Sequence, residues 1–245
     1  MSARNSGTHF YSLRSEGIRY ENLDIYYRYR TVKELISPGE GRCLDVGARD
    51  SNLKEFMLKN GYDYIGLDIS LHPSLNIVGD GHRLPFKDKV FDKIILSSVL
   101  EHVIEPQPFM NEIYRVLKKE GQVYGVVSFL EPFHNSYFNM SHKAIEHLLT
   151  ASRFENICIQ TGVMCQVLIL ARIIGIVGSK QLTLFSTLTK IMFPIKLILK
   201  MLYILLKTKN LLLRKNMIEF ENNFKDFYEG IALTFAGHFL FKATK

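Results

Sequence analysis

The chain has 245 residues, 47% of them hydrophobic, and a formal net charge of +7 at pH 7. This length and apolar content are enough to bury a sizeable core, in one large α/β domain or in one domain with an insertion. The first residues, MSARNSGTHFYSLRSEG, contain no apolar run of the kind that a secretory signal peptide needs. Three cysteines, Cys43, Cys158 and Cys165, lie in apolar runs without metal-ligand spacing. We therefore expect a cytoplasmic protein with reduced core cysteines and no metal site.

The positive charge is concentrated in one part of the chain. Residues 156–218 include nine Lys and Arg and no Asp or Glu, which leaves 22 basic and 24 acidic residues elsewhere. The rest of the chain is thus close to neutral, and all of the excess positive charge belongs to this segment.

Hydrophobic periodicity and turn residues predict an alternation of helices and strands. The predicted strands are 44–46, 64–67, 75–78, 91–96, 122–129 and 154–159. The predicted helices are 20–36, 52–59, one that opens at Ser97 and Ser98, 106–118 and 144–151. Such an alternation predicts a parallel sheet with right-handed crossovers.

An aspartate stands at the end of three predicted strands. Asp45 lies in CLDVGARDSN, Asp68 in YIGLDIS and Asp80 in IVGDGHR. The strand 91–96 is nearly all apolar, as expected for a parallel strand covered on both faces, and Ser97 follows it. Because the carboxyl ends of parallel strands meet at one edge of a sheet, we expect these residues to form a ligand-binding edge.

These segments, in this order, resemble the class I S-adenosylmethionine-dependent methyltransferases, in particular the broad methyltransferase domain 11-like group. In that group a Leu-Glu-His-Val segment, here Leu100 to Val103, follows the strand that corresponds to 91–96. IYRVLKKEGQVYGVVSF at 113–129 continues the resemblance, which covers residues 42–159. It implies S-adenosylmethionine as the cofactor. It also implies an α/β fold with a Rossmann-like, doubly wound and mostly parallel seven-stranded sheet and an antiparallel last strand.

The resemblance further implies how the chain is organised. We expect an N-terminal helical segment at 1–40, the Rossmann-like cofactor-binding core at 41–160 and a basic, apolar helical insertion at 161–227. The last strand should lie within 228–245, where 231–242 is the only late candidate.

The cofactor-binding residues that the resemblance implies are Asp45, Gly47, Ala48, Asp68, Ile69, Asp80, Gly81, His82 and Ser97. Gly47 has no side chain, so the methionine end of the cofactor can approach backbone amides at a helix N-terminus. The family usually has further glycines where Arg49 and Ser51 stand, so this turn departs from the family pattern. A plain strand-to-helix turn is the alternative interpretation.

Three of these positions have separate expected roles. Asp68 should accept hydrogen bonds from both ribose hydroxyls, and its alternative role is a helix N-cap. Asp80, with Gly81 and His82, should lie at the adenine, and Ser97 at the methionine moiety.

His134 is the candidate catalytic residue because it follows the strand 122–129, where an acceptor should meet the methyl group. A neutral imidazole there would take a proton from a hydroxyl acceptor near pH 7. The alternative is a loop histidine without a catalytic part. His102 is interpreted as structural or pocket-lining.

We expect methyl transfer to an oxygen or nitrogen acceptor, with a lipid, quinone or lipid-linked glycan preferred. The apolar stretches 163–177 and 193–206 are too short for a confident membrane-spanning helix. Lys196, Lys200 and Lys207 fall on one helical face, which suits peripheral contact with an anionic membrane at its inner face.

Other interpretations remain open. The insertion is alternatively a lid or a homodimer surface. The chain is alternatively an inactive methyltransferase-like binding module, a methyltransferase of soluble small molecules, or a nicotinamide-dependent dehydrogenase, which fits Asp80 and Leu-Glu-His-Val poorly. Nucleic acid is disfavoured, because the basic segment has few aromatic residues for base stacking.

Overall fold

The computed structural model describes residues 17–24, 29–49, 52–73, 75–131, 134–173, 198–199, 201–202 and 217–245. Its strands are β1 (Ile18–Tyr20), β2 (Gly41–Val46), β3 (Tyr62–Asp68), β4 (Ile77–Val78), β5 (Phe91–Ser97), β6 (Leu117–Ser128), β7 (Glu155–Thr161) and β8 (His238–Thr244). Its helices are α1 (Leu53–Lys59), α2 (Pro106–Val116), α3 (His142–Ala151), α4 (Cys165–Ile173) and α7 (Met217–Thr234), with short 3₁₀ helices η1 (Val32–Leu35) and η2 (Leu100–His102).

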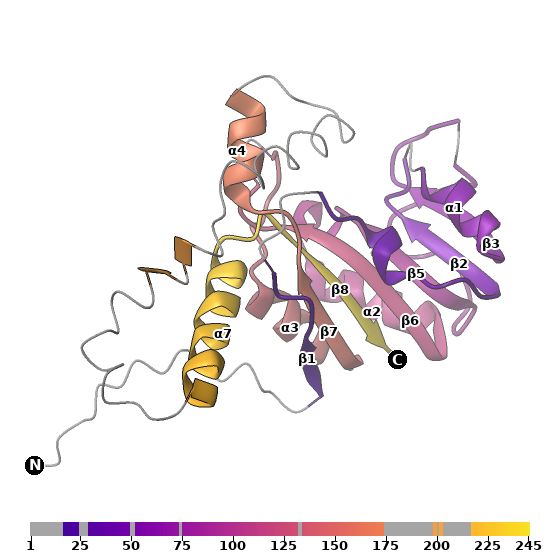
Figure 1. Cartoon of the computed structure of the whole chain (residues 1–245). Coiled ribbons are helices and arrows are strands. Elements are labelled where there is room, and N and C mark those ends of the chain that lie inside the picture. The colour runs from indigo at the N-terminus through magenta and orange to yellow at the C-terminus, as the bar shows by residue number, and fades with distance from the viewer. Residues whose placement is uncertain are drawn as a thin grey trace, which may run out of the picture.

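The strands form one twisted sheet in the order β1-β7-β8-β6-β5-β2-β3-β4 (Figure 1). All neighbouring strands run parallel except β8, which is antiparallel to both β6 and β7. From β2 the chain moves outward through β3 and β4 and then returns to place β5 on the other side of β2. This is the predicted doubly wound, Rossmann-like sheet with an antiparallel last strand. The described residues form eight strands instead of the expected seven, and β1 is the additional one.

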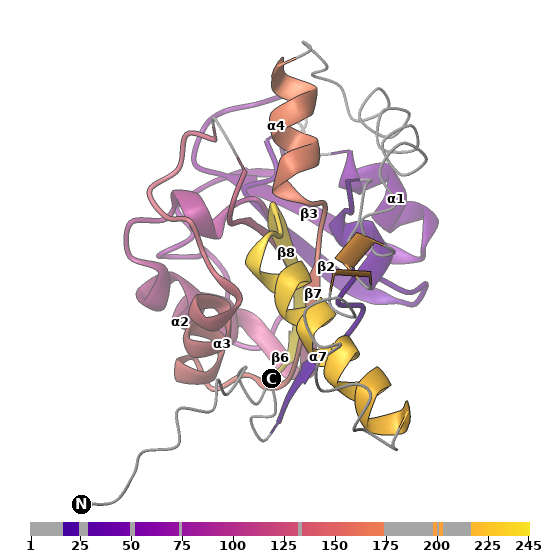
Figure 2. The same cartoon turned by 60° about the vertical axis from the view of Figure 1, so that its left-hand side comes forward.

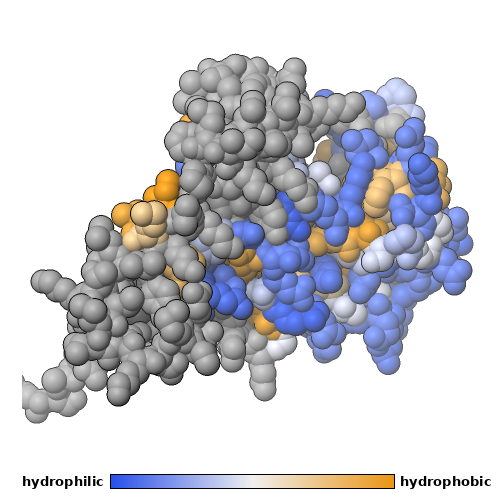
Figure 3. Space-filling view, viewed as in Figure 1, coloured by the Kyte–Doolittle hydropathy of each residue, from blue (hydrophilic) through white to orange (hydrophobic). Residues whose placement is uncertain are grey.

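Helices cover both faces of the sheet, because side chains of the central strands alternate between two clusters. Leu44 and Ile94 pack in a large cluster that includes residues of α2 and α3. Their neighbours Cys43 and Ile95 pack in a second cluster with Met57 of α1. Figure 2 shows α2 and α3 on one side of the sheet and α1 on the other. The described part of the face seen in Figure 3 is mainly hydrophilic, with separate apolar spots.

Two helices in and after the insertion, α4 and α7, pack on each other. Val167 and Leu168 of α4 share a buried cluster with Phe224, Tyr228 and Ala232 of α7. In both ribbon views α7 runs beside β1, outside the sheet (Figures 1 and 2). Of the helices that the structure describes, none is both long and apolar enough to cross a bilayer. Lys196, Lys200 and Lys207 lie outside the described residues.

The predicted helix 20–36 is wrong in the part that the structure describes. Ile18 and Tyr20 form a short edge strand that pairs in parallel with Ile157 and Ile159 of β7. Both side chains pack against the large core cluster, so tertiary contacts favour extended backbone here. Further along, the only helix in the described residues up to 36 is the 3₁₀ helix η1.

Several observed element boundaries also differ from the predicted ones. Helix α2 ends at Val116 instead of 118, because Leu117 is fully buried and pairs with Phe91 in the sheet. In the predicted strand 231–242, residues 231–234 belong to α7, where Ala232 is buried against α4. Of the strand predicted at 75–78, only Ile77 and Val78 form a strand, β4.

The residues after β5 do not open an α-helix as predicted. Ser98 has a φ of +56° and the chain then forms the 3₁₀ helix η2. No helix separates β3, β4 and β5 in the described residues, so the strand-helix alternation is incomplete there.

Candidate functional site

The carboxyl ends of β2, β3, β4 and β5 lie side by side, and β2 and β5 are neighbours although they are not consecutive. Between these two strands the order of the sheet reverses. In doubly wound sheets ligands bind outside the carboxyl ends of the strands at such a switch point. The predicted ligand edge therefore coincides with the position where this fold binds ligands.

The turn after β2 is held against the ends of β3 and β5. The N–H groups of Gly47 and Ala48 donate to the carbonyl of Leu67 at 2.8 and 3.0 Å. Gly47 has a φ of +77°, and a Cβ there would lie 2.6 Å from Val99 Cγ2. Glycine is thus required both by the backbone conformation and by the contact with the chain after β5.

Arg49, which departs from the family pattern, also has a positive φ of +24°. Its N–H donates to Asp68 Oδ2 at 3.2 Å, so the turn after β2 is joined to the end of β3. The backbone of Arg49 thus takes a conformation that favours glycine while keeping this bond. Ser51 lies outside the described residues.

Asp45 is buried at the end of β2 and accepts a hydrogen bond from the Tyr64 hydroxyl at 2.7 Å. This bond links β2 to the adjacent strand β3 and orients the carboxylate. Asp45 thus has a structural partner at the position where the resemblance implies a cofactor contact.

Asp68 stands at the end of β3 and is mostly buried. Its Oδ1 accepts from the N–H and the hydroxyl of Ser70, both at 2.9 Å, in addition to the Arg49 bond on Oδ2. No described helix begins after β3, so Asp68 closes a turn and is not a helix N-cap. Ile69 is 73% exposed beside it.

Asp80 follows β4 and holds the residues after it. Its Oδ1 accepts from the N–H of His82 at 2.9 Å and contacts His82 Nδ1 at 2.8 Å. These bonds hold the pKa of Asp80 below its usual value. Oδ2 accepts no hydrogen bond from the described residues, and the side chain is 53% exposed. Asp80 therefore keeps a free acceptor at the predicted adenine edge.

Gly81 and His82 both pack against Phe109 of α2. A Cβ on Gly81 would lie 2.2 Å from Phe109 Cε2, and the His82 and Phe109 ring centroids are 5.5 Å apart. Close packing of the turn on α2 explains the glycine. His82 Nε2 is buried and has no hydrogen-bond partner among the described residues.

Ser97 is half-buried at the end of β5, opposite Val126 of β6. Its neighbour Ser98 donates its N–H to the Val126 carbonyl at 2.9 Å. Ser97 therefore lies at the switch point, as expected for the methionine side of the edge.

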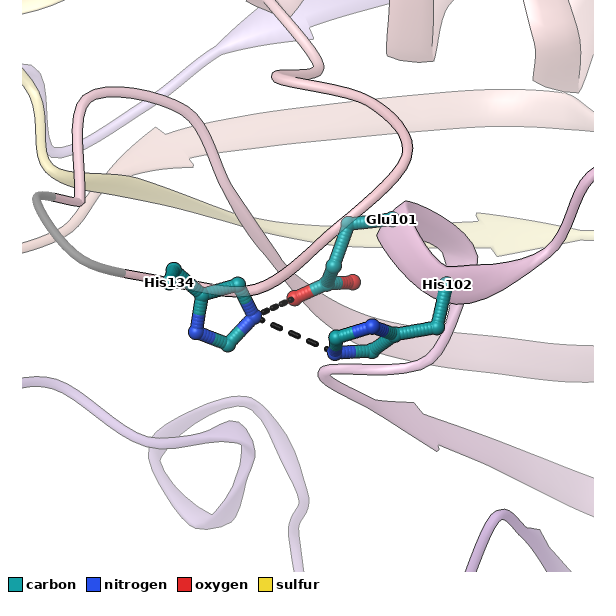
Figure 4. A group of neighbouring side chains, drawn as sticks. All are labelled: Glu101, His102 and His134. Carbon is teal, nitrogen blue, oxygen red and sulfur yellow. Dashed lines mark hydrogen bonds and ion pairs between the residues drawn. The ribbon is translucent and has the colours of Figure 1, made fainter.

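His134 lies in a cluster that the sequence does not predict (Figure 4). Its Nε2 is 3.2 Å from His102 Nε2 and 3.5 Å from Glu101 Oε1. Glu101 is fully buried, whereas His102 is exposed. The Leu-Glu-His-Val segment contains Glu101 and His102 side by side, so this segment was the available signal for the missed residue Glu101.

Residues 44–125 match the protein family described as a methyltransferase domain. A demethylmenaquinone methyltransferase from Streptomyces griseus is 33% identical over 92 residues, which are 34% of this chain and 40% of that protein. One from Mycolicibacterium paratuberculosis is 31% identical over 137 residues, 52% of this chain and 57% of that protein. The chain thus spans roughly half of the curated relatives it matches, or less.

Among solved structures, phosphoethanolamine N-methyltransferase 2 from Haemonchus contortus, in complex with S-adenosyl-L-methionine, aligns with a TM-score of 0.49 and 16% identity. The alignment covers 86% of this chain and 49% of that chain. From the family match and the strand order of the sheet, residues 44–125 form a methyltransferase domain of the class I, S-adenosylmethionine-dependent type.

Proposed function

We propose that the chain binds S-adenosylmethionine at the carboxyl ends of β2 to β5 and transfers its methyl group to an oxygen or nitrogen acceptor or, in a quinone, to a ring carbon. One observation carries this proposal. The segment that matches the methyltransferase family contains the switch point of the sheet, with the Gly47 turn, Asp68 and Asp80 on three successive neighbouring strands.

The acids at this edge retain the acceptor capacity that a nucleoside requires. A carboxylate offers about four lone-pair sites. The described residues donate three hydrogen bonds to Asp68, from the Arg49 amide and from two groups of Ser70. One acceptor position on Asp68 therefore remains, which is enough for one ribose hydroxyl and not for the two that were expected. On Asp80, Oδ2 remains for the adenine amino group. These residues fit S-adenosylmethionine.

Bound S-adenosylmethionine supplies a methyl group that is already activated by its positive sulfur. The contribution of the chain is therefore mainly to hold acceptor, methyl carbon and sulfur in line. For a hydroxyl acceptor we assign proton uptake to His134. The Glu101 carboxylate 3.5 Å from His134 Nε2 stabilises the imidazolium that this step forms.

The preferred acceptor class is a lipid, a quinone or a lipid-linked glycan. The two bacterial relatives are named for demethylmenaquinone, which is a quinone. In the insertion, Ile198, Met201 and Leu202 are 44%, 63% and 46% exposed. Exposed apolar residues in a segment without acids suit an anionic membrane surface, where such an acceptor would be found.

The test is methyl transfer from S-adenosylmethionine with a radiolabelled methyl group. Purified protein is incubated with demethylmenaquinone, with a lipid extract of the host membrane and with the aqueous extract. We expect label in the organic phase and a mass increase of one methyl group in the product. Label found only in aqueous products would contradict a membrane-borne acceptor and indicate a soluble one. Binding of the cofactor without turnover on any of these acceptors would contradict the enzyme and favour a binding module.

A further inference from the structure

The cluster of Glu101, His102 and His134 combines two imidazoles and one carboxylate at the ends of β5 and β6. Figure 4 shows the two rings turned toward each other beside the Glu101 carboxylate. One ligand atom from each residue lies within 4.8 Å of the others. We propose that these three residues bind one divalent first-row transition-metal ion through the two Nε2 atoms and the carboxylate. This donor set suits ions such as Zn²⁺, Mn²⁺ and Co²⁺. The sequence, judged from its cysteine spacing, predicts no metal site.

Two of the three separations between the donor atoms are those that a shared ion requires. Two donors bound about 2.1 Å from one ion lie about 3.0 Å apart at a right angle and about 3.4 Å apart at the tetrahedral angle. The two Nε2 atoms are 3.2 Å apart, and His134 Nε2 is 3.5 Å from Glu101 Oε1. These two separations place His134 Nε2 where it can share an ion with each of the other two residues.

Glu101 provides a second, independent indication of a ligand. The residue is fully buried, and Oε1 accepts the N–H of Ser128 at 3.2 Å. Oε2 is buried as well and has no hydrogen-bond partner among the described residues. A buried carboxylate oxygen is strongly disfavoured unless it is paired or coordinated. An ion at this site would supply the missing interaction.

Backbone hydrogen bonds hold the two parts of the cluster together. The Glu101 carbonyl accepts the N–H of Tyr137 at 2.9 Å and that of Phe138 at 3.2 Å. These bonds join η2, which carries two of the ligands, to the loop that carries His134. Ligands that are already positioned lose little freedom when an ion binds.

The surroundings of the cluster are also suited to a cation. Glu131 lies close by, and its Oε2 accepts the Ser128 hydroxyl at 3.0 Å. Burial, and after it the charges of Glu131 and Glu101, raise the pKa of the Tyr29 hydroxyl. Two carboxylates therefore act together on this part of the protein, and their combined field attracts a divalent ion.

A hydrogen bond between His102 and His134 alone is the competing explanation. One neutral ring would donate its N–H to the lone pair of the other, which explains the 3.2 Å separation but leaves Glu101 Oε2 without a partner. Ion binding uses the Nε2 lone pair of His134, so the proposed proton uptake by His134 belongs to the ion-free protein. Ion binding itself does not depend on the proposed function.

The test is a calorimetric titration of the full chain with Zn²⁺ after treatment with a chelator and its removal. We expect one ion per chain. The His102→Ala and His134→Ala variants should each bind more than about tenfold more weakly. His102 is exposed, so its substitution leaves the core intact. His147→Ala, at an exposed histidine of α3, is the matched control and should bind as the wild type does.

Titration with Co²⁺ adds a spectroscopic signal that depends on metal ligation. Substituting a histidine with a purely structural role would not change this signal. Visible absorption bands should appear in the wild type and in His147→Ala and be absent in His134→Ala. No Zn²⁺ binding by the wild type, or unchanged affinity in His102→Ala, would overturn the proposal. S-adenosylmethionine binding measured on the same chelator-treated protein separates this failure from a failure of the proposed function.

Discussion

His102 Nε2 and His134 Nε2 lie 3.2 Å apart, although the two residues belong to different connections of the sheet. His102 ends the 3₁₀ helix after β5, and His134 follows β6. Glu101, next to His102 in sequence, reaches the same nitrogen of His134. The acceptor side of the proposed site is therefore built by two loops that depend on each other, and a change in one should be detected in the other.

Replacement of His134 tests its role in proton uptake. With a hydroxyl acceptor, His134→Ala should lower turnover by roughly 10² to 10⁴ and leave S-adenosylmethionine affinity nearly unchanged. Steady-state rates from pH 6 to 8 and calorimetry measure the two quantities, and His147→Ala is the control for loss of a histidine. If His134→Ala keeps the wild-type turnover across this pH range, His134 has no role in the catalytic step.

Gly47→Ala should destabilise the fold and weaken cofactor binding, because the new Cβ meets Val99 in a left-handed backbone conformation. Gly17 also has a positive φ, of +78°, but has no atom within 4 Å of its Cβ position. Gly17→Ala thus measures the backbone effect alone, about 1 to 2 kcal/mol. Gly47→Ala should cost about 1 to 3 kcal/mol more. Adding Val99→Ala should restore part of that difference in urea unfolding, and equal losses in the two single variants would contradict the contact.

The stability of the fold should decrease in mild acid because of His238. This residue is fully buried, contacts the Arg30 carbonyl through Nε2 at 2.9 Å and has its pKa lowered by burial to about 4. Above the unfolded value of 6.5 the stabilising effect is complete. As the pH falls from 6.5 toward 4, the unfolded chain binds a proton that the folded chain does not, so the free energy of unfolding decreases by up to about 3 kcal/mol.

Urea unfolding at several pH values measures this dependence. His238→Gln should be less stable at pH 7.5 and should show a flatter pH dependence than the wild type, whereas the exposed His147→Gln should not. An identical slope in His238→Gln and the wild type would show that another group causes the acid sensitivity.

The basic insertion is tested with lipid vesicles. Replacing Lys196, Lys200 and Lys207 together by Glu should abolish co-sedimentation with anionic vesicles, since each lysine near such a surface contributes about 1 kcal/mol. Neutral vesicles should bind the wild type only weakly. If the wild type does not sediment with anionic vesicles even at low salt, the membrane proposal fails. A mass that rises with concentration in light scattering would then favour a dimer surface, and a lipid-indifferent monomer would favour a lid.

The sheet was largely predictable because its central strands are apolar runs bounded by turn residues. Strand 91–96 was found within one residue of β5 for this reason. Strand β1 was missed, since its three residues become a strand only by pairing with β7, which is distant in sequence. The start of the last strand was misplaced because an apolar helix end and an apolar strand follow each other there.

The site was predictable only where chain order determines it. Asp45, Asp68 and Asp80 stand at strand ends, and parallel neighbours bring such ends together. The hydrogen bonds that the Arg49 and Ser70 amides donate to Asp68 depend on loop conformations that have no periodic signal. Glu101 and His134 meet only when two loops pack together, so their contact could not be read from spacing.

The most direct test of the central claim is calorimetric titration of the full chain with S-adenosylmethionine. The wild type should bind one molecule. Asp68→Ala should lose about 1 to 3 kcal/mol of binding free energy, because a ribose hydrogen bond is removed and its donor is left unpaired. Asp63→Ala, at an exposed aspartate near the other end of the same strand, is the matched control and should bind as the wild type does. No binding by the folded wild type, or equal affinity in folded Asp68→Ala and the wild type, would contradict the cofactor site described here.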